Sequence, residues 1–458
     1  MLALRAGRVL SGSLLLFCKP RKNLMLILLQ LGPFVLLLLL IAVLPLIAEH
    51  TWEKHRNKLL VSVVLAIPSV IWLLSQGPLG REHLLHALDE YVQFILMLSA
   101  LYAVSGVLVV HGDLPANPFG NTLWLALGAV LANLVGTTGA SMLLLRPLLR
   151  ANHHRRQNRH IPIFFVFIVA NCGGLLLPLG DPPLFLGFLK GVDFFWTLQL
   201  WPQWLFVNGV LLAVFFVWDA RARRRELGLV SAPSTEDYHP LRVEGLRAGI
   251  PIVLGVMATL LLQAPPIARQ LGDFLRRFIP NAIDPLLPAW VGALILAGLT
   301  LLAVMLIRRT PRETRVLVWG PLLEVAILFA GIFITMAPAL QLLAALPALP
   351  WTESQLVWAT GGMSGVLDNA PTYLAFATLA DPDGPSALAI ARPGLLRAIS
   401  CGAVWMGALT YIGNGPNFLI KAVADHMGYR TPSFFGYLVY SLPVLLPVFG
   451  LATLLFFR

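Results

Sequence analysis

Apolar segments long enough to cross a lipid bilayer dominate the chain. Such a span needs roughly 20 consecutive apolar residues, and the pattern predicts an all-α polytopic membrane protein. The apolar segments fall at 24–48, 59–75, 91–111, 121–149, 161–190 and 198–218, and then at 248–264, 288–307, 316–341, 354–380, 395–426 and 433–457.

The long polar connection 219–247 divides these segments into two sets. It contains a run of arginines and then a Ser- and Pro-containing stretch, a composition typical of a linker. We therefore expect a first transmembrane repeat at 24–218, a cytoplasmic linker at 219–247 and a second, inverted repeat at 248–458. Residues 1–23 form an N-terminal extension.

Unusual features of the first half recur in the second half after a shift of about 233 residues, which predicts an internal repeat. Glu90 falls on Glu324, and Lys190 falls within two residues of Lys421. The polar stretch 136–141 falls on 368–373. Ala170, Gly174, Gly180, Pro183, Phe185 and Leu186 fall on Ala403, Gly407, Gly413, Pro416, Phe418 and Leu419.

The fourth apolar segment of each half has polar residues in its middle, so we expect a re-entrant hairpin there. Each repeat then has five true spans, and this odd number inverts the second repeat. The basic blocks at 146–159, 221–225 and 308–315 share one side, which the positive-inside rule makes cytoplasmic. The same count places the N-terminus outside, although residues 1–22 are basic. These residues form a signal-like extension or an extra element, or the first span is misplaced.

The composition of the chain argues against several classes of function. The chain is 58% hydrophobic and 12% charged, and its mean hydropathy is +0.79. The net charge of +11 is explained by the cytoplasmic connections, so no nucleic-acid partner is expected. The three cysteines lack metal-ligand spacing, and no phosphate-binding loop or nucleophile–base pair occurs. We expect no enzyme activity and no cofactor; transport would draw on an ion gradient, passive flow or a partner.

The fifth apolar segment of each half is interrupted, which predicts a broken helix. Unwound backbone at membrane depth is tolerated around a protein-lined cavity. Glycines permit the unwinding, and prolines block continuation of the helix. The helix-breaking residues are Gly173, Gly174, Gly180, Pro182 and Pro183 in the first half, and Gly413, Gly415 and Pro416 in the second.

Two carboxylates, Asp181 and Asp368, lie in these interruptions and hairpins. An acid at membrane depth is costly and marks an ion pathway, although a helix cap or an interface position is the alternative. Burial favours the protonated acid, so such a group can exchange a proton for a hard cation. The candidate neutral ligands for Na⁺ or substrate are Thr137, Thr138, Ser141, Asn171, Asn369, Asn414 and Asn417.

Other polar residues receive simpler interpretations. The hydroxyls of Thr137, Thr138 and Ser141 could instead bond to the backbone of their own helix. We interpret His153, His154 and His160 as part of a solvated cytoplasmic face. Glu90 and Glu324 are expected to begin helices near an interface. No resident metal is predicted beyond transported Na⁺.

The runs 136–147, 171–190 and 368–371 resemble bacterial sodium:proton antiporters of the citrate-transporter-like group. This group belongs to the ion-transporter superfamily, alongside the divalent-anion:sodium symporters. The resemblance covers residues from about 60 to 457. It implies two inverted repeats, each with a hairpin and a broken helix, a homodimer with elevator-like movement, and a bacterial inner-membrane location.

The sequence departs from the symporters at both hairpins and at the first broken helix. The symporters have Ser-Asn-Thr at the hairpin tips, where this chain has Gly136-Thr137-Thr138 and Asp368-Asn369-Ala370. Where they have Gly-Thr-Pro-Pro, this chain has Asp181 within Gly-Asp-Pro-Pro. An added acid repels a dicarboxylate and favours a cation.

We therefore expect exchange of Na⁺ or Li⁺ for H⁺ at the intramembrane carboxylates. Na⁺-coupled uptake of citrate or another organic anion is the alternative. An anion-efflux channel subunit that works with a soluble ATPase is the third hypothesis.

Overall fold

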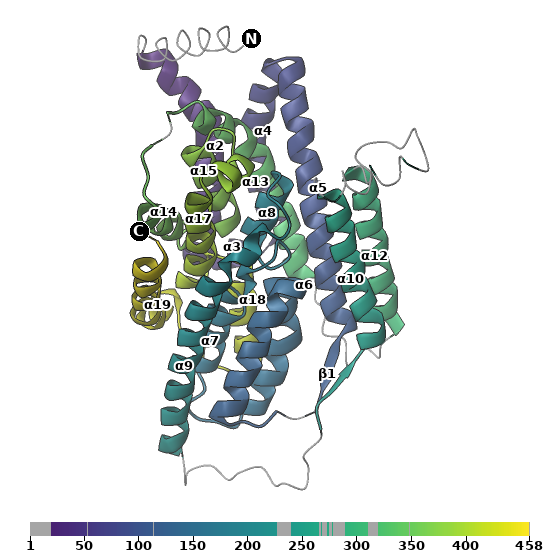
Figure 1. The fold of residues 1–458 in the computed structure, drawn as a ribbon, viewed down its shortest axis with the longest axis vertical. Helices are drawn as coiled ribbons and strands as arrows, with labels where there is room; N and C mark the ends of the chain where they lie inside the picture. Colours follow the sequence, from purple (N-terminus) through teal and green to yellow (C-terminus); the bar gives the residue numbers. More distant parts are fainter. Residues whose placement is uncertain are drawn as a thin grey trace.

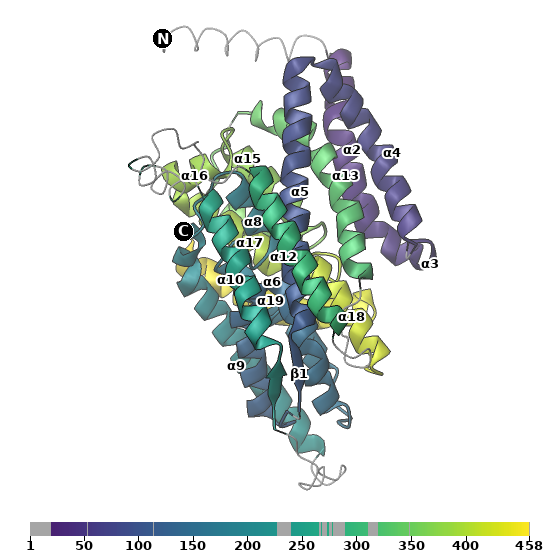
Figure 2. The same cartoon turned by 90° about the vertical axis from the view of Figure 1, so that its right-hand side faces the viewer.

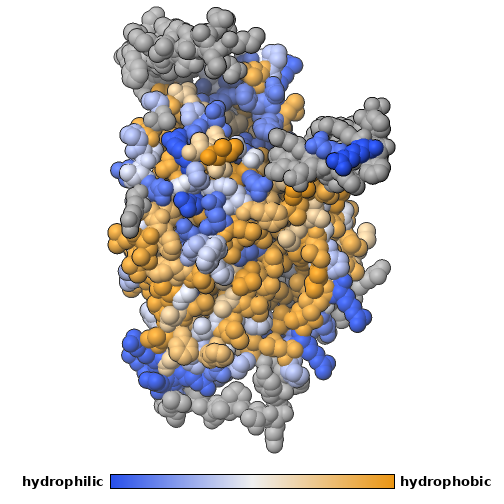
Figure 3. Space-filling model, in the orientation of Figure 1, coloured by the Kyte–Doolittle hydropathy of each residue, from blue (hydrophilic) through white to orange (hydrophobic). Residues whose placement is uncertain are grey.

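The computed structural model is almost entirely helical, with long apolar helices as its main elements. It describes residues 20–457, except 53, 113, 227–239, 310–318, 348 and the part of 265–288 other than 267, 273 and 277. Within these described residues, 9 helices are long and apolar enough to cross a membrane. Hydrophobic residues cover the middle of the molecule and hydrophilic residues gather towards its ends (Figure 3). The chain is thus an all-α, multi-pass membrane protein.

The first half contains the elements up to residue 226. They are α2 (Pro20–Ile47), α3 (Glu49–Trp52), α4 (His55–Ser75), α5 (Pro78–Val107), β1 (Val109–His111), α6 (Pro118–Asn152), α7 (His160–Ile168), η1 (Cys172–Leu175), α8 (Pro182–Leu189), η2 (Trp196–Leu200) and α9 (Trp201–Glu226). The predicted extension 1–23 lies outside the described residues up to residue 19, and α2 begins at Pro20.

The second half contains the elements from residue 242 onwards. They are β2 (Arg242–Glu244), α10 (Leu246–Gln263), α12 (Ala289–Arg309), α13 (Gly320–Ala344), α14 (Glu353–Ser364), α15 (Asn369–Ala380), α16 (Pro385–Ala391), α17 (Pro393–Met406), η5 (Gly407–Leu409), α18 (Gly415–His426) and α19 (Phe434–Phe456). Under the shift of about 233 residues, α4 corresponds to α12, α5 to α13, and α8 to α18.

The helices form two packed groups (Figures 1 and 2). We call α2, α4, α5, α10, α12 and α13 the scaffold helices, because they pack chiefly against one another. The core helices are α6, α7, α8, α9, α14, α15, α17, α18 and α19. Across the scaffold, the ring of Phe94 on α5 stacks on Phe329 of α13, with centroids 4.7 Å apart. Helices α6 and α8 pack on α5, and α15 packs on α13, so α5 and α13 face the core.

The long helix α6 is a hairpin whose two arms meet at Gly136. This residue has φ 77° and ψ 157°, a conformation that is essentially restricted to glycine. The turn directs the next backbone N–H, from Thr137, to the carbonyl oxygen of Gly180 at 2.8 Å. The hairpin tip is thereby attached to the break between α7 and α8.

A buried polar cluster joins the end of α9 to the connection after α6. The Asp219 carboxylate is fully buried and pairs with Arg155 at 2.6 Å and with His160 at 2.8 Å. It also accepts a hydrogen bond from Asn121 at 2.9 Å. Arg155 makes a second ion pair with Glu226 at 3.3 Å. These contacts satisfy each charge at a site that water does not reach.

This cluster corrects two expectations. Residues 219–226 of the expected linker continue α9 as a helix, because Asp219 and Glu226 turn inward to Arg155. His160 is buried rather than part of a solvated face, since its ring nitrogen faces Asp219. His153 and His154 are exposed, as expected. Residues 227–239 of the expected linker lie outside the described residues, whereas its last part forms β2 and the beginning of α10.

A short antiparallel ribbon is the one sheet among the described residues. Strand β1 pairs with β2, with Val110 opposite Val243. The last residues of the apolar segment 91–111 therefore leave the helix. The ribbon connects the end of α5 to the beginning of α10.

We predict that Asp219→Asn destabilises the protein by about 3 kcal/mol, because it leaves Arg155 buried with less compensation. Thermal unfolding in detergent measures this effect. Asp193→Asn is the matched control, since Asp193 accepts a local backbone hydrogen bond at an exposed position and asparagine can do the same. Equal melting temperatures for the two variants would contradict the prediction.

We also predict that Gly136→Ala destabilises the hairpin by about 1 to 3 kcal/mol, because alanine rarely adopts this backbone conformation. Its Cβ would also lie 3.2 Å from the Leu179 carbonyl oxygen. Gly139→Ala is the control, since a Cβ there would make ordinary contacts of 3.5 Å or more. The comparison uses the same unfolding assay, and a more stable Gly136→Ala protein would exclude the proposed constraint.

Candidate functional site

Chain breaks from both halves meet at one buried point. The hairpin tip at Thr137 and the break before α8 come from the first half. The tip before α15 and the break before α18 come from the second half. Asp181 and Asn414 immediately precede α8 and α18, and they are 233 residues apart. The two residues therefore correspond under the repeat and lie in direct contact.

Asp181 is at the centre of this point, with 1% of its surface exposed. Its Oδ1 accepts hydrogen bonds from the Thr137 hydroxyl at 3.1 Å and from the Asn414 amide at 3.0 Å. Its Oδ2 accepts one from the Asn369 amide at 2.6 Å. The carboxylate thus joins the first half of the chain to the second.

Asparagine side chains extend the network beyond the carboxylate. The amide of Asn414 also reaches Asn171 Oδ1 at 3.1 Å, and the Asn171 amide donates to Asn417 Oδ1 at 2.8 Å. The Asn417 amide donates in turn to the carbonyl oxygens of Gly407 and Thr410, at 2.8 and 2.9 Å. These carbonyls belong to the second break, so the side chains replace the missing helical hydrogen bonds.

We define the Asp181 cluster as the six buried residues Thr137, Asn171, Asp181, Asn369, Asn414 and Asn417. All six were predicted as ligands from the sequence, and the structure brings them together. One acceptor in the cluster, Asn369 Oδ1, is buried without a hydrogen-bond partner among the described residues. A buried acceptor without a partner is costly and calls for a ligand or water.

The helix-breaking residues shape the backbone around the cluster. In each half two glycines pack against each other. A Cβ on Gly180 would lie 2.3 Å from the Gly174 carbonyl oxygen, and one on Gly413 would lie 2.6 Å from that of Gly407. The other predicted helix breakers lie at the start of a half-helix or inside a break: Gly173 in η1, Pro182 and Pro183 in the first turn of α8, and Gly415 and Pro416 in the first turn of α18.

Every side-chain partner that the structure gives to Asp181 is neutral. Within the described part of the chain, no Lys, Arg or His makes an ion pair with this carboxylate, although other buried acids such as Asp219 and Glu90 have basic partners. An ionised carboxylate without a counter-charge is unfavourable at this depth. Burial without a counter-charge therefore favours the protonated acid or a bound cation at this position.

Three of the predicted ligands lie outside these contacts. Asp368 is half-buried, and its carboxylate caps α15 by accepting a hydrogen bond from the Ala370 N–H at 3.0 Å. A helix cap was the alternative to an ion ligand when Asp368 was interpreted from the sequence. Ser141 donates its hydroxyl to the Thr137 carbonyl within the second arm of the hairpin. Thr138 lies half-buried on the same arm.

Three residues that were not predicted from the sequence bind the backbone of the first break. Asn133 donates to the Gly173 carbonyl at 2.8 Å and accepts from the Leu176 N–H at 2.7 Å. Trp204 and Asn208 donate to the carbonyl oxygens of Gly173 and Cys172. Asparagines inside apolar segments were the available signal, because a polar side chain there needs a partner.

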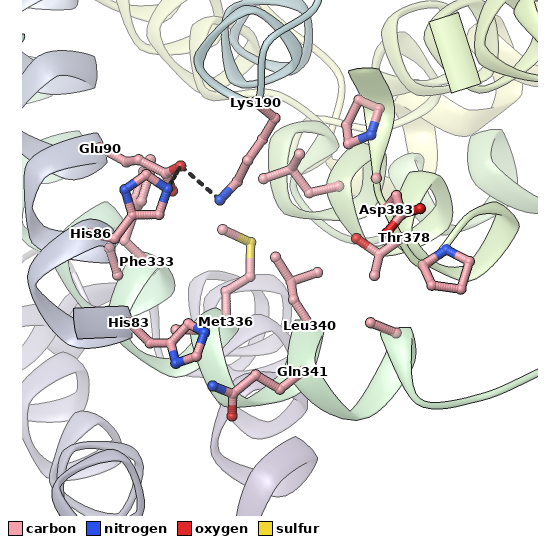
Figure 4. Close-up of a pocket in the computed structure, with 17 residues that line it drawn as sticks. His83, His86, Glu90, Lys190, Phe333, Met336, Leu340, Gln341, Thr378 and Asp383 are labelled. Carbon is pink, nitrogen blue, oxygen red and sulfur yellow. Dashed lines mark ion pairs between the residues drawn. The ribbon is translucent and has the colours of Figure 1, made fainter. Parts of the chain in front are cut away.

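A cavity of about 260 Å³ lies between the scaffold and core helices. Glu90, Lys190 and His86 line one side of it, and His83 and Asp383 lie elsewhere on its wall (Figure 4). Glu90 is buried well inside α5 rather than at a helix start, which corrects the expectation for it. Its carboxylate pairs with Lys190 at 2.6 Å and with His86 at 3.1 Å.

The chain was compared with protein families and with curated proteins. Residues 23–457 match a family described as "Putative citrate transport". No curated protein matches the chain. The family match covers all the membrane helices apart from the first residues of α2. The chain therefore belongs to this citrate-transport family, and it is a multi-pass membrane protein of the secondary-transporter type.

Proposed function

We propose that the protein exchanges Na⁺ or Li⁺ for H⁺ across a bacterial inner membrane, with Asp181 as the group that carries either ion. The observation behind this proposal is the buried Asp181 carboxylate, whose partners are all neutral. A proton on the acid neutralises the site in one step of the cycle. A metal cation bound to the ionised carboxylate neutralises it in the other.

Oxygen atoms suitable for a hard cation surround Asp181. The Thr137 hydroxyl oxygen contacts its carboxylate directly, and the side-chain oxygen of Asn369 is buried without a partner among the described residues. Alkali and alkaline-earth cations prefer such carboxylate, hydroxyl and carbonyl oxygens. When the proton returns to Asp181, the cluster loses its anionic ligand and the cation is released. Exchange follows because the two ions compete for one carboxylate.

Na⁺-coupled transport of citrate is the second candidate, and the family description favours it. The half-helices α8 and α18 both begin at the cluster, and helix N-termini attract anions. A Na⁺ ion on Asp181 would offset the repulsion between this acid and a substrate carboxylate. In this case the asparagine amides would donate to citrate.

The first test is Asp181→Asn in everted membrane vesicles from an antiporter-deficient host. Respiration acidifies the vesicle interior, and a ΔpH-sensitive dye reports proton release when NaCl or LiCl is added. We expect Asp181→Asn to reduce the response to that of vesicles without the protein, because an amide cannot exchange a proton for a cation.

Asp368→Asn is the matched control, because asparagine caps a helix about as well as aspartate. We expect it to keep most of the exchange activity. Full exchange by the Asp181 variant would exclude the proposed mechanism. Sodium-dependent accumulation of radiolabelled citrate by the native protein, without a dye response to NaCl, would establish the second candidate instead.

A further prediction concerns Asn369→Ala. Loss of its free side-chain oxygen should raise the half-saturating Na⁺ concentration roughly tenfold, which corresponds to one lost contact of about 1.4 kcal/mol. The maximal rate should change less. Asn158→Ala, in the connection after α6, is the control and should leave the Na⁺ dependence unaltered. An unchanged Na⁺ dependence in both variants would remove Asn369 from the cation site.

A further inference from the structure

Each half-helix that begins at the Asp181 cluster has a lysine at some distance from the cluster. Lys190 follows the last residue of α8, and Lys421 lies in α18. Each facing scaffold helix carries a glutamate, Glu90 on α5 and Glu324 on α13. The repeat thus supplies two acid–base pairs between scaffold and core, one in each half.

Only the first of these pairs is formed in the structure. Lys190 Nζ lies 2.6 Å from Glu90 Oε1, and the Glu90 side chain is 6% exposed. His86 also contacts this carboxylate. Figure 4 shows Lys190 extending from the core towards Glu90 across the edge of the cavity. This ion pair connects the end of α8 directly to the scaffold helix α5.

The members of the second pair have other partners. Lys421 pairs with Asp425 on its own helix at 2.7 Å, and Glu324 pairs with Lys58 of α4 at 2.6 Å. Lys421 and Asp425 are 28% and 41% exposed. Exposed pairs within one helix contribute little to stability, so Lys421 is readily available to a stronger partner.

The position of α18 along α13 shows how far Lys421 lies from Glu324 along the helix axis. A Cβ on Gly415 would lie 4.0 Å from Val325, the neighbour of Glu324. The first turn of α18 therefore stands at the level of Glu324, and Lys421 lies six residues further along. With a rise of 1.5 Å per residue, a slide of roughly 9 Å along the helix axis would bring Lys421 to this level.

The same slide would separate the first pair. Helices α8 and α18 extend from the cluster towards different parts of the molecule. Gly191, just after α8, lies against Ser386 of α16, whereas Tyr429, just after α18, donates to the Leu149 carbonyl near the end of α6. We infer that the two half-helices run in opposite directions from the cluster. A displacement that carries Lys421 towards Glu324 must carry Lys190 past Glu90. If the core helices move together, the two pairs exclude each other.

We propose that Glu90–Lys190 and Glu324–Lys421 are alternating latches, each holding the core against the scaffold in one of two transport states. The proposal rests on the proposed exchange of Na⁺ or Li⁺ for H⁺ at the Asp181 cluster, which requires the cluster to be exposed to the two sides of the membrane in turn. The structure is the state in which the Glu90 latch is closed. The other state has Lys190 released, Lys421 on Glu324, and the core about 9 Å further along.

Distances between spin labels in nanodiscs test this proposal without measuring transport. One label is placed at Leu79 on the scaffold helix α5 and the other at Ile390 on the core side, both exposed positions. Cys18→Ser removes one native thiol, and Cys172 and Cys401 are buried. The native protein should show a main distance and a second population that differs from it by up to about 9 Å.

The two lysines should have opposite effects. Lys190→Met should raise the ratio of the second population to the first by at least about fivefold, and Lys421→Met should lower it by a similar factor. Glu90→Gln should reproduce the effect of Lys190→Met, which guards against misfolding of a single variant. Lys54→Met, an exposed lysine before α4, is the control for loss of charge and should change neither population.

Shifts in the same direction for Lys190→Met and Lys421→Met, or no shift in either, would overturn the latch proposal. A failure of the ion-exchange proposal gives a different result. In that case Asp181→Asn would keep its exchange activity, while the label distances would still report opposite effects of the two lysines.

Discussion

A buried carboxylate with no positive partner among the described residues is the constraint on which this architecture depends. Asp181 is surrounded by hydroxyl and amide donors from both halves, and these donors lie where the helices are interrupted. The interruptions would be unfavourable in lipid. They are tolerated because asparagines donate to the freed carbonyl groups within the protein, and because glycine pairs let the chain pack closely at each break. The acid, the broken helices and the asparagines therefore form one interdependent unit.

Two buried acids of this protein, Asp219 and Asp181, have different kinds of partner. Where α9 meets the connection after α6, Asp219 is neutralised by Arg155 and His160, which fixes the geometry of that region. Among the described residues, no such cation pairs with Asp181, whose partners are neutral donors. The two buried acids thus differ in their surroundings. One belongs to a structural connection, and the environment of the other favours a protonated acid or a bound cation.

The helical segments and the six residues of the Asp181 cluster could be predicted from the sequence, because polar residues and glycines in an apolar segment are conspicuous. The partners of these residues could not. Asp181 and Asp368 look alike in sequence, yet one lies in the cluster and the other caps α15, a difference set by the direction in which each chain break turns. Likewise, the burial of Glu90 and His160 depends on Lys190 and Asp219, which are distant in sequence. Such pairings arise from tertiary packing and have no local pattern.

The direct contact between Asp181 and Asn414 has a consequence for how such a protein could arise. If the two halves descend from one duplicated gene, the ancestral halves carried the same residue at this position. Two ionised acids in contact would need two positive charges to balance them, whereas two amides would need none. Divergence to one aspartate and one asparagine leaves a single unit of charge to be balanced. The number of cations handled in a cycle would then have been set by one substitution after duplication, at a position where the fold tolerates either side chain.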